Sequence, residues 1–244
     1  MFKADWPAPF NVKTAISTRE GGVSLPPYDG LNLGSHVNDR PEAVAQNRQL
    51  FRQQINMPAE PLWLNQVHGT DCVLLEQTDF STGPFTADAS TTKTKGLVSV
   101  VLTADCLPVL FCDLAGTQVA AAHAGWRGLV DGVLEQTLTQ FTDPSQVMAW
   151  LGPAIGPTAF EVGDEVRLAF IEKEAKADAA FTAVPNKPGK WLADLYQLAR
   201  LRLNAAGVSQ IYGGGFCTYT DSDDFYSYRR DGETGRMASC IWID

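Results

Sequence analysis

Residues 97–122, LVSVVLTADCLPVLFCDLAGTQVAAA, decide the fold of this chain. They contain three apolar runs of strand length, Leu97–Leu102, Leu107–Cys112 and Val119–Ala122. Asp113–Gly116, between the second and third runs, has the composition of a hairpin turn. The first run is almost continuously apolar, which indicates strands that are covered on both faces. We therefore expect a buried sheet at the centre of the protein.

Hydrophobic periodicity predicts further elements on either side of this sheet. Two more apolar runs predict strands at Val147–Leu151 and Ile211–Tyr212. The predicted helices begin at Asp39–Glu42 with Val44, Phe51 and Ile55 on one face, span Trp126–Phe141 and Gly163–Lys173, and include one marked by Leu192, Leu195, Tyr196, Ala199 and Leu203 and ended by Gly207. Because strands and helices do not follow a strict βαβ rhythm, we predict an α+β fold with a mixed or antiparallel sheet. We expect a single domain over residues 1–244.

The composition excludes several classes of function. The 244 residues are 45% hydrophobic and 19% charged, as in an ordinary globular protein with a sizeable core. A net charge of −9 disfavours a nucleic-acid partner, and no apolar run is long enough to cross a membrane. Five cysteines without framework spacing, and an N-terminus without an apolar leader, predict a cytoplasmic protein.

Two of the three histidines and one cysteine lie in short segments punctuated by glycine or proline. His68 stands in NQVHG, Cys106 in TADCLP and His123 in AHAGWRG, each beside an apolar run. Two imidazoles and one thiolate can hold a zinc ion, and three protein ligands leave a fourth position open, as in catalytic sites. Each of the three residues could instead be an ordinary core residue. Their coincidence at predicted strand ends favours a metal centre in an enzyme.

Other polar residues are candidates for contacts with an anionic substrate. Arg19 precedes a Gly-Gly turn whose amides could join it in an anion-binding nest. Arg229 lies in Tyr-Arg-Arg-Asp near the C-terminus, and His36 lies in a polar loop before the first predicted helix. The alternative for each arginine is a surface salt bridge, and for His36 a role in a turn.

Seven segments together resemble the signature segments of the YfiH family. They are Ser17–Ser24, Asn32–Gly34, Gln66–Gly69, Thr103–Val109, Ala122–Gly128, Gly152–Pro157 and Tyr228–Asp231. Members of this family were long labelled laccase-like polyphenol oxidases and are now described as purine nucleoside phosphorylases. The resemblance runs in order from about residue 17 to the C-terminus.

The resemblance implies mixed β-sheets packed together with helices on the outside. It implies a zinc ion held by His68, Cys106 and His123, and phosphorolysis of adenosine, inosine, guanosine and methylthioadenosine with deamination of adenosine. The substrate contacts suggested on the same basis are Arg19, Asn32, His36 and Arg229. We expect Asp105, next to Cys106, to orient a ligand or to carry a proton. The expected partners are purine nucleosides and phosphate.

Three alternatives use the same residues. Cys106 could be the nucleophile of a metal-free hydrolase with His123 or His68 as its base, acting for example on a peptidoglycan precursor. A lone site of two histidines and one cysteine also suits copper, although three histidines cannot build the trinuclear cluster of a laccase. A zinc-stabilised binding domain is disfavoured, because structural zinc sites use four protein ligands.

Overall fold

The computed structural model describes residues 1–77, 83 and 85–244. Its centre is a six-stranded sheet in the order β11-β7-β5-β6-β3-β2. These strands are β2 (Cys72–Leu74), β3 (Ala89–Thr92), β5 (Leu107–Asp113), β6 (Val119–Ala124), β7 (Val147–Leu151) and β11 (Gln210–Gly213). The outer pairs β2/β3 and β11/β7 are parallel and the inner pairs are antiparallel, so the sheet is mixed, as predicted.

A second sheet packs against this one and carries the first apolar run of the sequence. It has the order β1-β12-β4 and is antiparallel throughout. Its strands are β1 (Val12–Ile16), β4 (Val98–Thr103) and β12 (Met237–Ile243). A third, smaller antiparallel sheet has the order β8-β10-β9, formed by β8 (Glu161–Gly163), β9 (Phe181–Ala183) and β10 (Lys190–Ala193).

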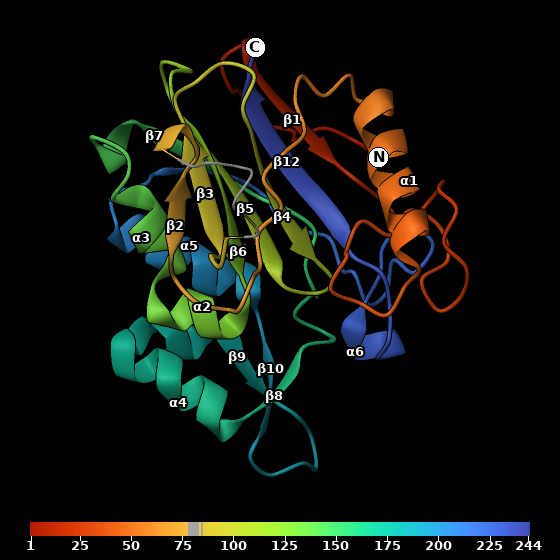
Figure 1. Cartoon of the computed structure of the whole chain (residues 1–244). Coiled ribbons are helices and arrows are strands. Elements are labelled where there is room, and N and C mark those ends of the chain that lie inside the picture. Colours follow the sequence, from red (N-terminus) through yellow and green to blue (C-terminus); the bar gives the residue numbers. More distant parts are fainter. Residues whose placement is uncertain (78–82, 84) are drawn as a thin grey trace.

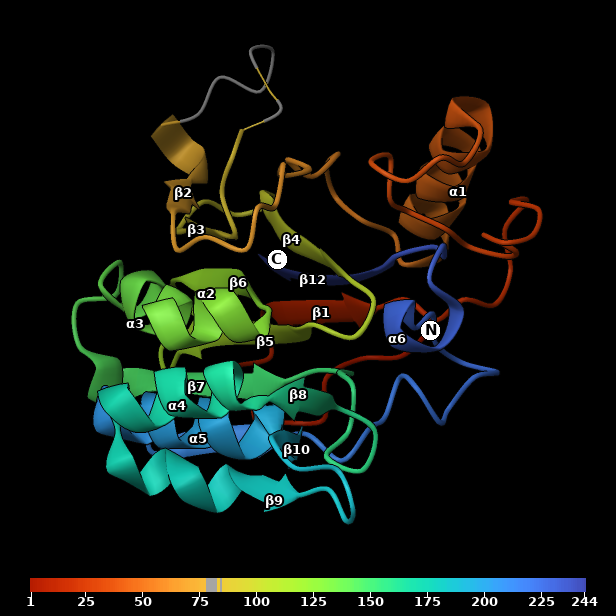
Figure 2. The same ribbon diagram turned by 90° about the horizontal axis from the view of Figure 1, so that it is seen from below.

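Helices cover both outer faces (Figures 1 and 2). On one side α1 (Pro41–Gln54) lies over the second sheet. On the other side the six-stranded sheet is covered by α2 (Trp126–Asp131), α3 (Val133–Leu138), α4 (Asp164–Lys173) and α5 (Leu195–Ala205). Short helical turns complete the chain: η1 (Leu75–Gln77), η3 (Pro144–Gln146), η4 (Ala175–Ala180) and α6 (Tyr228–Asp231). The predicted α+β class is confirmed. No helix in the described part of the chain is both long and apolar enough to span a membrane.

Alternation along β5 and β6 divides the core into two layers. Val109, Phe111 and Ala122 point to the helix side, whereas Leu110 and Ala121 point to the second sheet. Both sets are fully buried. This two-sided burial accounts for the unbroken apolar runs that predicted the sheet.

Two predicted helix boundaries are corrected. The helix expected over Trp126–Phe141 is two helices, because Gly132 takes the left-handed conformation at φ +104° and ends α2. Leu192 lies in β10 rather than in α5, which begins after its cap, Asp194. The helix predicted to begin at Asp39–Glu42 is α1, which begins at Pro41 and has no side-chain cap.

Candidate metal centre and pocket

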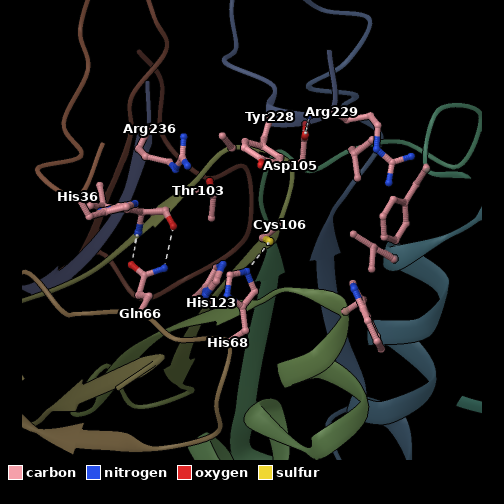
Figure 3. Close-up of a pocket in the computed structure, with 16 residues that line it drawn as sticks. His36, Gln66, His68, Thr103, Asp105, Cys106, His123, Tyr228, Arg229 and Arg236 are labelled. Atoms are coloured by element: carbon pink, nitrogen blue, oxygen red, sulfur yellow. Dashed lines mark hydrogen bonds between the residues drawn. The ribbon is translucent and has the colours of Figure 1, made fainter. Parts of the chain in front are cut away.

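Strand pairing brings Cys106 and His123 to the same end of the central sheet. In the antiparallel β5/β6 pair, Leu107 faces Ala124 and Pro108 faces His123. Cys106 immediately precedes β5, so its thiol lies beside the end of β6. His68 comes from the loop before β2 and completes the group, as Figure 3 shows.

The donor atoms of His68, Cys106 and His123 lie within 4.8 Å of one another. Cys106 Sγ is 3.7 Å from His68 Nε2, and the two imidazole rings meet edge to face with centroids 4.8 Å apart. Donors around a tetrahedral zinc ion stand about 3.3–3.7 Å apart, given Zn–N and Zn–S bonds of about 2.0 and 2.3 Å. The donor set therefore fits one metal ion, which would draw the widest donor pair together by about 1 Å. His123 is buried, Cys106 is half-buried and His68 is exposed on the solvent side.

A fully buried carboxylate, Asp88, holds both histidines. Its Oδ1 lies 2.8 Å from His123 Nδ1 and accepts the amide of His68 at 2.9 Å. Its Oδ2 accepts the amides of Val67 and Gly69 at 3.1 and 2.7 Å. A carboxylate bonded to the far nitrogen of a metal-binding histidine fixes the orientation of the ring and raises its basicity.

The cluster favours a thiolate beside an imidazolium when no metal is bound. Burial alone would raise the pKa of Cys106, but its interactions with His123 and His68 lower the pKa to about 6. Burial likewise disfavours the charged form of His123, yet Cys106 and Asp88 raise the pKa of His123 to about 9. The pair thus titrates as a unit, with the two charges stabilising each other.

The turn that carries Cys106 is fixed by Asp105, which adopts φ +87°. Asp105 Oδ1 accepts a hydrogen bond from Thr218 Oγ1 at 2.6 Å, and Oδ2 accepts the amide of Arg229 at 2.7 Å. Both carboxylate oxygens are therefore engaged by groups outside the histidine–cysteine cluster. This arrangement supports a role in positioning the Cys106 turn rather than in carrying protons.

The cluster lies in a pocket of about 500 Å³, within the range of about 300–1,000 Å³ typical of small-molecule sites. One wall is apolar and includes Trp126, Ile155 and Phe160. Gly125 borders the cluster, where a side-chain Cβ would come 2.6 Å from His68 Cδ2 and 3.0 Å from Cys106 Sγ.

Two of the four predicted substrate contacts line this pocket. His36 and Arg229 do so, and Arg229 also donates to the carbonyl of Glu161 at 2.8 Å. Arg19 lies in a different hollow, where it pairs with Asp29 at 3.0 Å. Asn32 is fully buried outside the pocket lining, and its side chain accepts the amide of Arg236 at 2.9 Å.

Three residues of this region were not predicted from the sequence. Strand pairing brings Asp88 and Arg236 to the site, and Tyr228 lines the pocket from α6. Tyr228 lies in Tyr228–Asp231, one of the segments that resemble the YfiH family, and Asn32–Gly34, another of them, packs against Arg236. These segments indicated the neighbourhood of both residues, but not their place in the pocket.

Comparison with known proteins places the chain in a family. A family described as multi-copper polyphenol oxidoreductase laccase matches residues 13–244. Purine nucleoside phosphorylase YfiH of Escherichia coli is 57% identical, over 98% of this chain and 96% of the relative. A purine nucleoside phosphorylase of Pseudomonas aeruginosa is 51% identical over the same shares of the two chains. The chain belongs to the YfiH family.

Solved structures support this assignment. A Neisseria meningitidis protein of family DUF152 is 54% identical and superposes with a TM-score of 0.95, covering 100% of this chain and 98% of that one. The hypothetical protein YfiH of Bacillus licheniformis is 30% identical with a TM-score of 0.89, covering 96% of this chain and 93% of that one. The YfiH fold is thus shared along nearly the whole chain.

Proposed function

We propose that this protein is a zinc-dependent purine nucleoside phosphorylase. The observation that carries the proposal is the convergence of His68, Cys106 and His123 in a pocket with an apolar wall. Relatives at 57% and 51% identity bear the name of that activity. We extend the proposal to adenosine, inosine, guanosine and methylthioadenosine as substrates. We also propose a cytoplasmic location, because all five cysteines are free thiols.

The pocket supports nucleoside binding through its shape and chemistry. Trp126 and Phe160 offer aromatic surface for a purine ring, and Arg229 stands over the Phe160 ring at 5.5 Å. In phosphorolysis an oxygen of hydrogenphosphate forms a bond to C1′ of the ribose while the C1′–N9 bond breaks. The electron pair leaves on N9, and the proton of hydrogenphosphate ends on the purine. The protein must therefore hold an anion and a base at the same carbon.

The residues of the cluster fit zinc, since two imidazoles and one thiolate form a common zinc donor set. When bound, the metal would supply Lewis acidity beside the substrate. Asp88 keeps the His123 ring turned toward the site, and Gly125 leaves room for it. A laccase-type copper enzyme is the weaker assignment, because the chain has three histidines in all and a trinuclear copper cluster requires more.

We also propose deamination of adenosine at the same site. Water adds across C6 and N1, the C6–N6 bond breaks, and the amino group leaves as ammonia with the second proton of the water, which gives inosine. Zinc deaminases of nucleobases use a related set of histidine and cysteine ligands. This reaction needs no phosphate, so it provides a separate readout of the cluster.

A second candidate is a metal-free hydrolase with Cys106 as nucleophile. The observation in its favour is the sequence of contacts from Cys106 to His123 and on to Asp88, which resembles a catalytic triad. A thiol with a pKa of about 6 is ionised at neutral pH. A peptidoglycan precursor would be a substrate to test for such an enzyme.

One experiment separates these candidates. Protein purified without added metal is analysed for zinc and copper, then incubated with adenosine or inosine with and without phosphate. We expect near-stoichiometric zinc, free base and ribose 1-phosphate, with base release abolished in Cys106→Ala. Cys72→Ala, another half-buried cysteine outside the cluster, is the matched control and should keep full activity. A metal-free protein that cleaves no purine nucleoside would overturn the proposal in favour of the hydrolase.

A further inference from the structure

Hydrogen bonds and packing contacts fix the backbone and side chain of Arg236. Its amide donates to Asn32 Oδ1 at 2.9 Å, and its carbonyl accepts the amide of Leu33 at 3.1 Å. Gly34 packs against its side chain, where a Cβ would come 2.7 Å from Arg236 Cγ. One terminal nitrogen, Nη1, donates to the carbonyls of residues 234 and 235 at 2.9 and 3.0 Å. The side chain is therefore fixed before any ligand arrives.

The remaining donors of this guanidinium are uncommitted. Within the described part of the chain, Nε and Nη2 of Arg236 have no hydrogen-bond partner, and no carboxylate lies within ion-pair distance. Arg236 nevertheless lines the pocket. Burial disfavours the charge of this half-buried guanidinium, an effect that the charges of Cys106 and Asp105 only partly oppose, so a bound anion would stabilise it.

Strand pairing places this charge next to the metal cluster. Arg236 immediately precedes β12, and the register pairs Met237 with Thr103, the last residue of β4. The turn that carries Cys106 follows at once. Figure 3 shows Arg236 and Arg229 at opposite ends of the labelled group, with Cys106 and the two cluster histidines between them.

His36 lines the pocket at the end that contains Arg236. Loss of hydration and the charges of Arg236, Arg48 and His123 lower the pKa of His36 to about 4, although the residue is exposed. His36 is therefore neutral at pH 7 and can donate one N–H. Arg48 braces this loop by donating to the carbonyl of Leu33 at 3.0 Å.

The other arginines are less suitable for an anion. Arg229 also lines the pocket, but its Nη1 donates to the Glu161 carbonyl and its charge acts on the Glu161 carboxylate, so part of its charge is already engaged by an acid. Arg19 is paired with Asp29 and lies outside the pocket. Of these three arginines, Arg236 alone combines a fixed stem, free donors and a place beside the cluster.

We propose that Arg236, with His36, forms the subsite for inorganic phosphate in this pocket, with Arg236 binding two phosphate oxygens through Nε and Nη2. This inference rests on the proposed phosphorylase function and deepens it. It also explains the Asn32-Leu33-Gly34 segment, which holds Arg236 from behind instead of touching substrate. The apolar wall at Trp126 and Phe160 is then left for the purine.

The test compares inorganic phosphate binding and phosphate KM in matched variants. Arg236→Gln removes the charge but keeps a donor toward residues 234 and 235, and Arg236→Lys keeps the charge. We expect Arg236→Gln to weaken phosphate binding, measured by titration calorimetry, on the order of 10²-fold, the scale of a lost charge-assisted pair of bonds. Arg236→Lys should recover part of that loss. Arg52→Gln, on the exposed face of α1, is the charge-matched control and should change nothing.

Each outcome decides between the subsite and the reaction. Metal content and unfolding are measured in every variant, so that loss of metal or of fold is recognised. If Arg236→Gln keeps its metal and the wild-type phosphate affinity, the subsite is wrong even if nucleosides are cleaved. If phosphate binding depends on Arg236 but no nucleoside is cleaved, the reaction is wrong and the subsite stands. If Arg236 instead governs the affinity for adenosine 5′-monophosphate and not for inorganic phosphate, the assignment to inorganic phosphate is overturned.

Discussion

Replacing Asp88 by asparagine tests whether one buried carboxylate organises the whole metal centre. Oδ1 of Asp88 accepts hydrogen bonds from the amide of His68 and the ring of His123, and Oδ2 accepts them from the amides of Val67 and Gly69. Asparagine presents one oxygen and one NH₂ group. Whichever way the amide is turned, two of the four donors then face another donor.

The expected losses follow from this count. Each hydrogen bond to a charged acceptor contributes about 1.5–3 kcal/mol, so the free energy of unfolding should fall by about 3–6 kcal/mol. Loss of the carboxylate behind a histidine ligand should weaken metal binding by about 10–100-fold. The pKa of Asp88 lies below its usual range, because bonds from His123 and the backbone outweigh the effect of burial. Its stabilisation is therefore present above the unfolded pKa of about 3.9 and disappears only as the pH falls through the lower folded value.

Denaturant unfolding of the chelator-treated proteins and competition for zinc with a chromophoric chelator measure the two losses. The control is Asp71→Asn, which changes an exposed acid immediately before β2 and should unfold like the wild type. The stability difference for Asp88→Asn should hold between about pH 5 and 8 and shrink below about pH 4. If Asp88→Asn matched the wild type in both stability and zinc affinity, the carboxylate would have no organising role and the reasoning would be refuted.

Three more predictions concern the same centre. In metal-free protein, alkylation of Cys106 should rise as the pH passes about 6, while Cys72, whose pKa burial raises to about 12, should stay unreactive; mass spectrometry of the labelled peptides checks both. Alkylation of Cys106 that rises only near pH 8.5 would contradict the imidazolium pairing. Acid should release the metal between about pH 6 and 5 while near-UV circular dichroism stays native, because protons compete for the ligands, and metal retained at pH 4 would argue against histidine ligation. Gly125→Ala should reduce metal content or turnover at least about 10-fold, because its Cβ would displace His68 and Cys106. Unchanged metal content and turnover would show that the two side chains can move aside without loss of the site.

The sequence predicted the parts of the fold that burial alone determines. β4, β5 and β6 were found because residues on both faces of each strand are buried, which leaves an unbroken apolar run. The same signal concealed the break at Gly132. Leu129 and Val133, on either side of it, are both fully buried, so the apolar stripe continues across a left-handed residue. Periodicity reports burial, and it does not report whether the backbone is continuous.

The site was predictable where residue types are rare and hidden where they are common. His68 and His123 stand out because the chain has three histidines, and Cys106 adjoins an apolar run. Asp88 is one acid among 28 aspartates and glutamates, and its role depends on the pairing of β3 with β6. Arg236 lies 130 residues from Cys106, and only the pairing of β4 with β12 brings it to the same end of the sheet.

Two residues of the centre hold conformations that a chain without constraints would avoid. His68 has φ +62° and Asp105 has φ +87°, and such backbone costs on the order of 1–3 kcal/mol each. Asp88 holds the first through the amides of residues 67–69, and Thr218 with the amide of Arg229 holds the second. None of these bonds involves a metal, and the core on both faces of the central sheet is continuous without one. The positions of the three side chains are therefore held by the protein itself, and we expect that removing a bound metal would leave the fold intact, unlike small zinc domains whose folding depends on the ion.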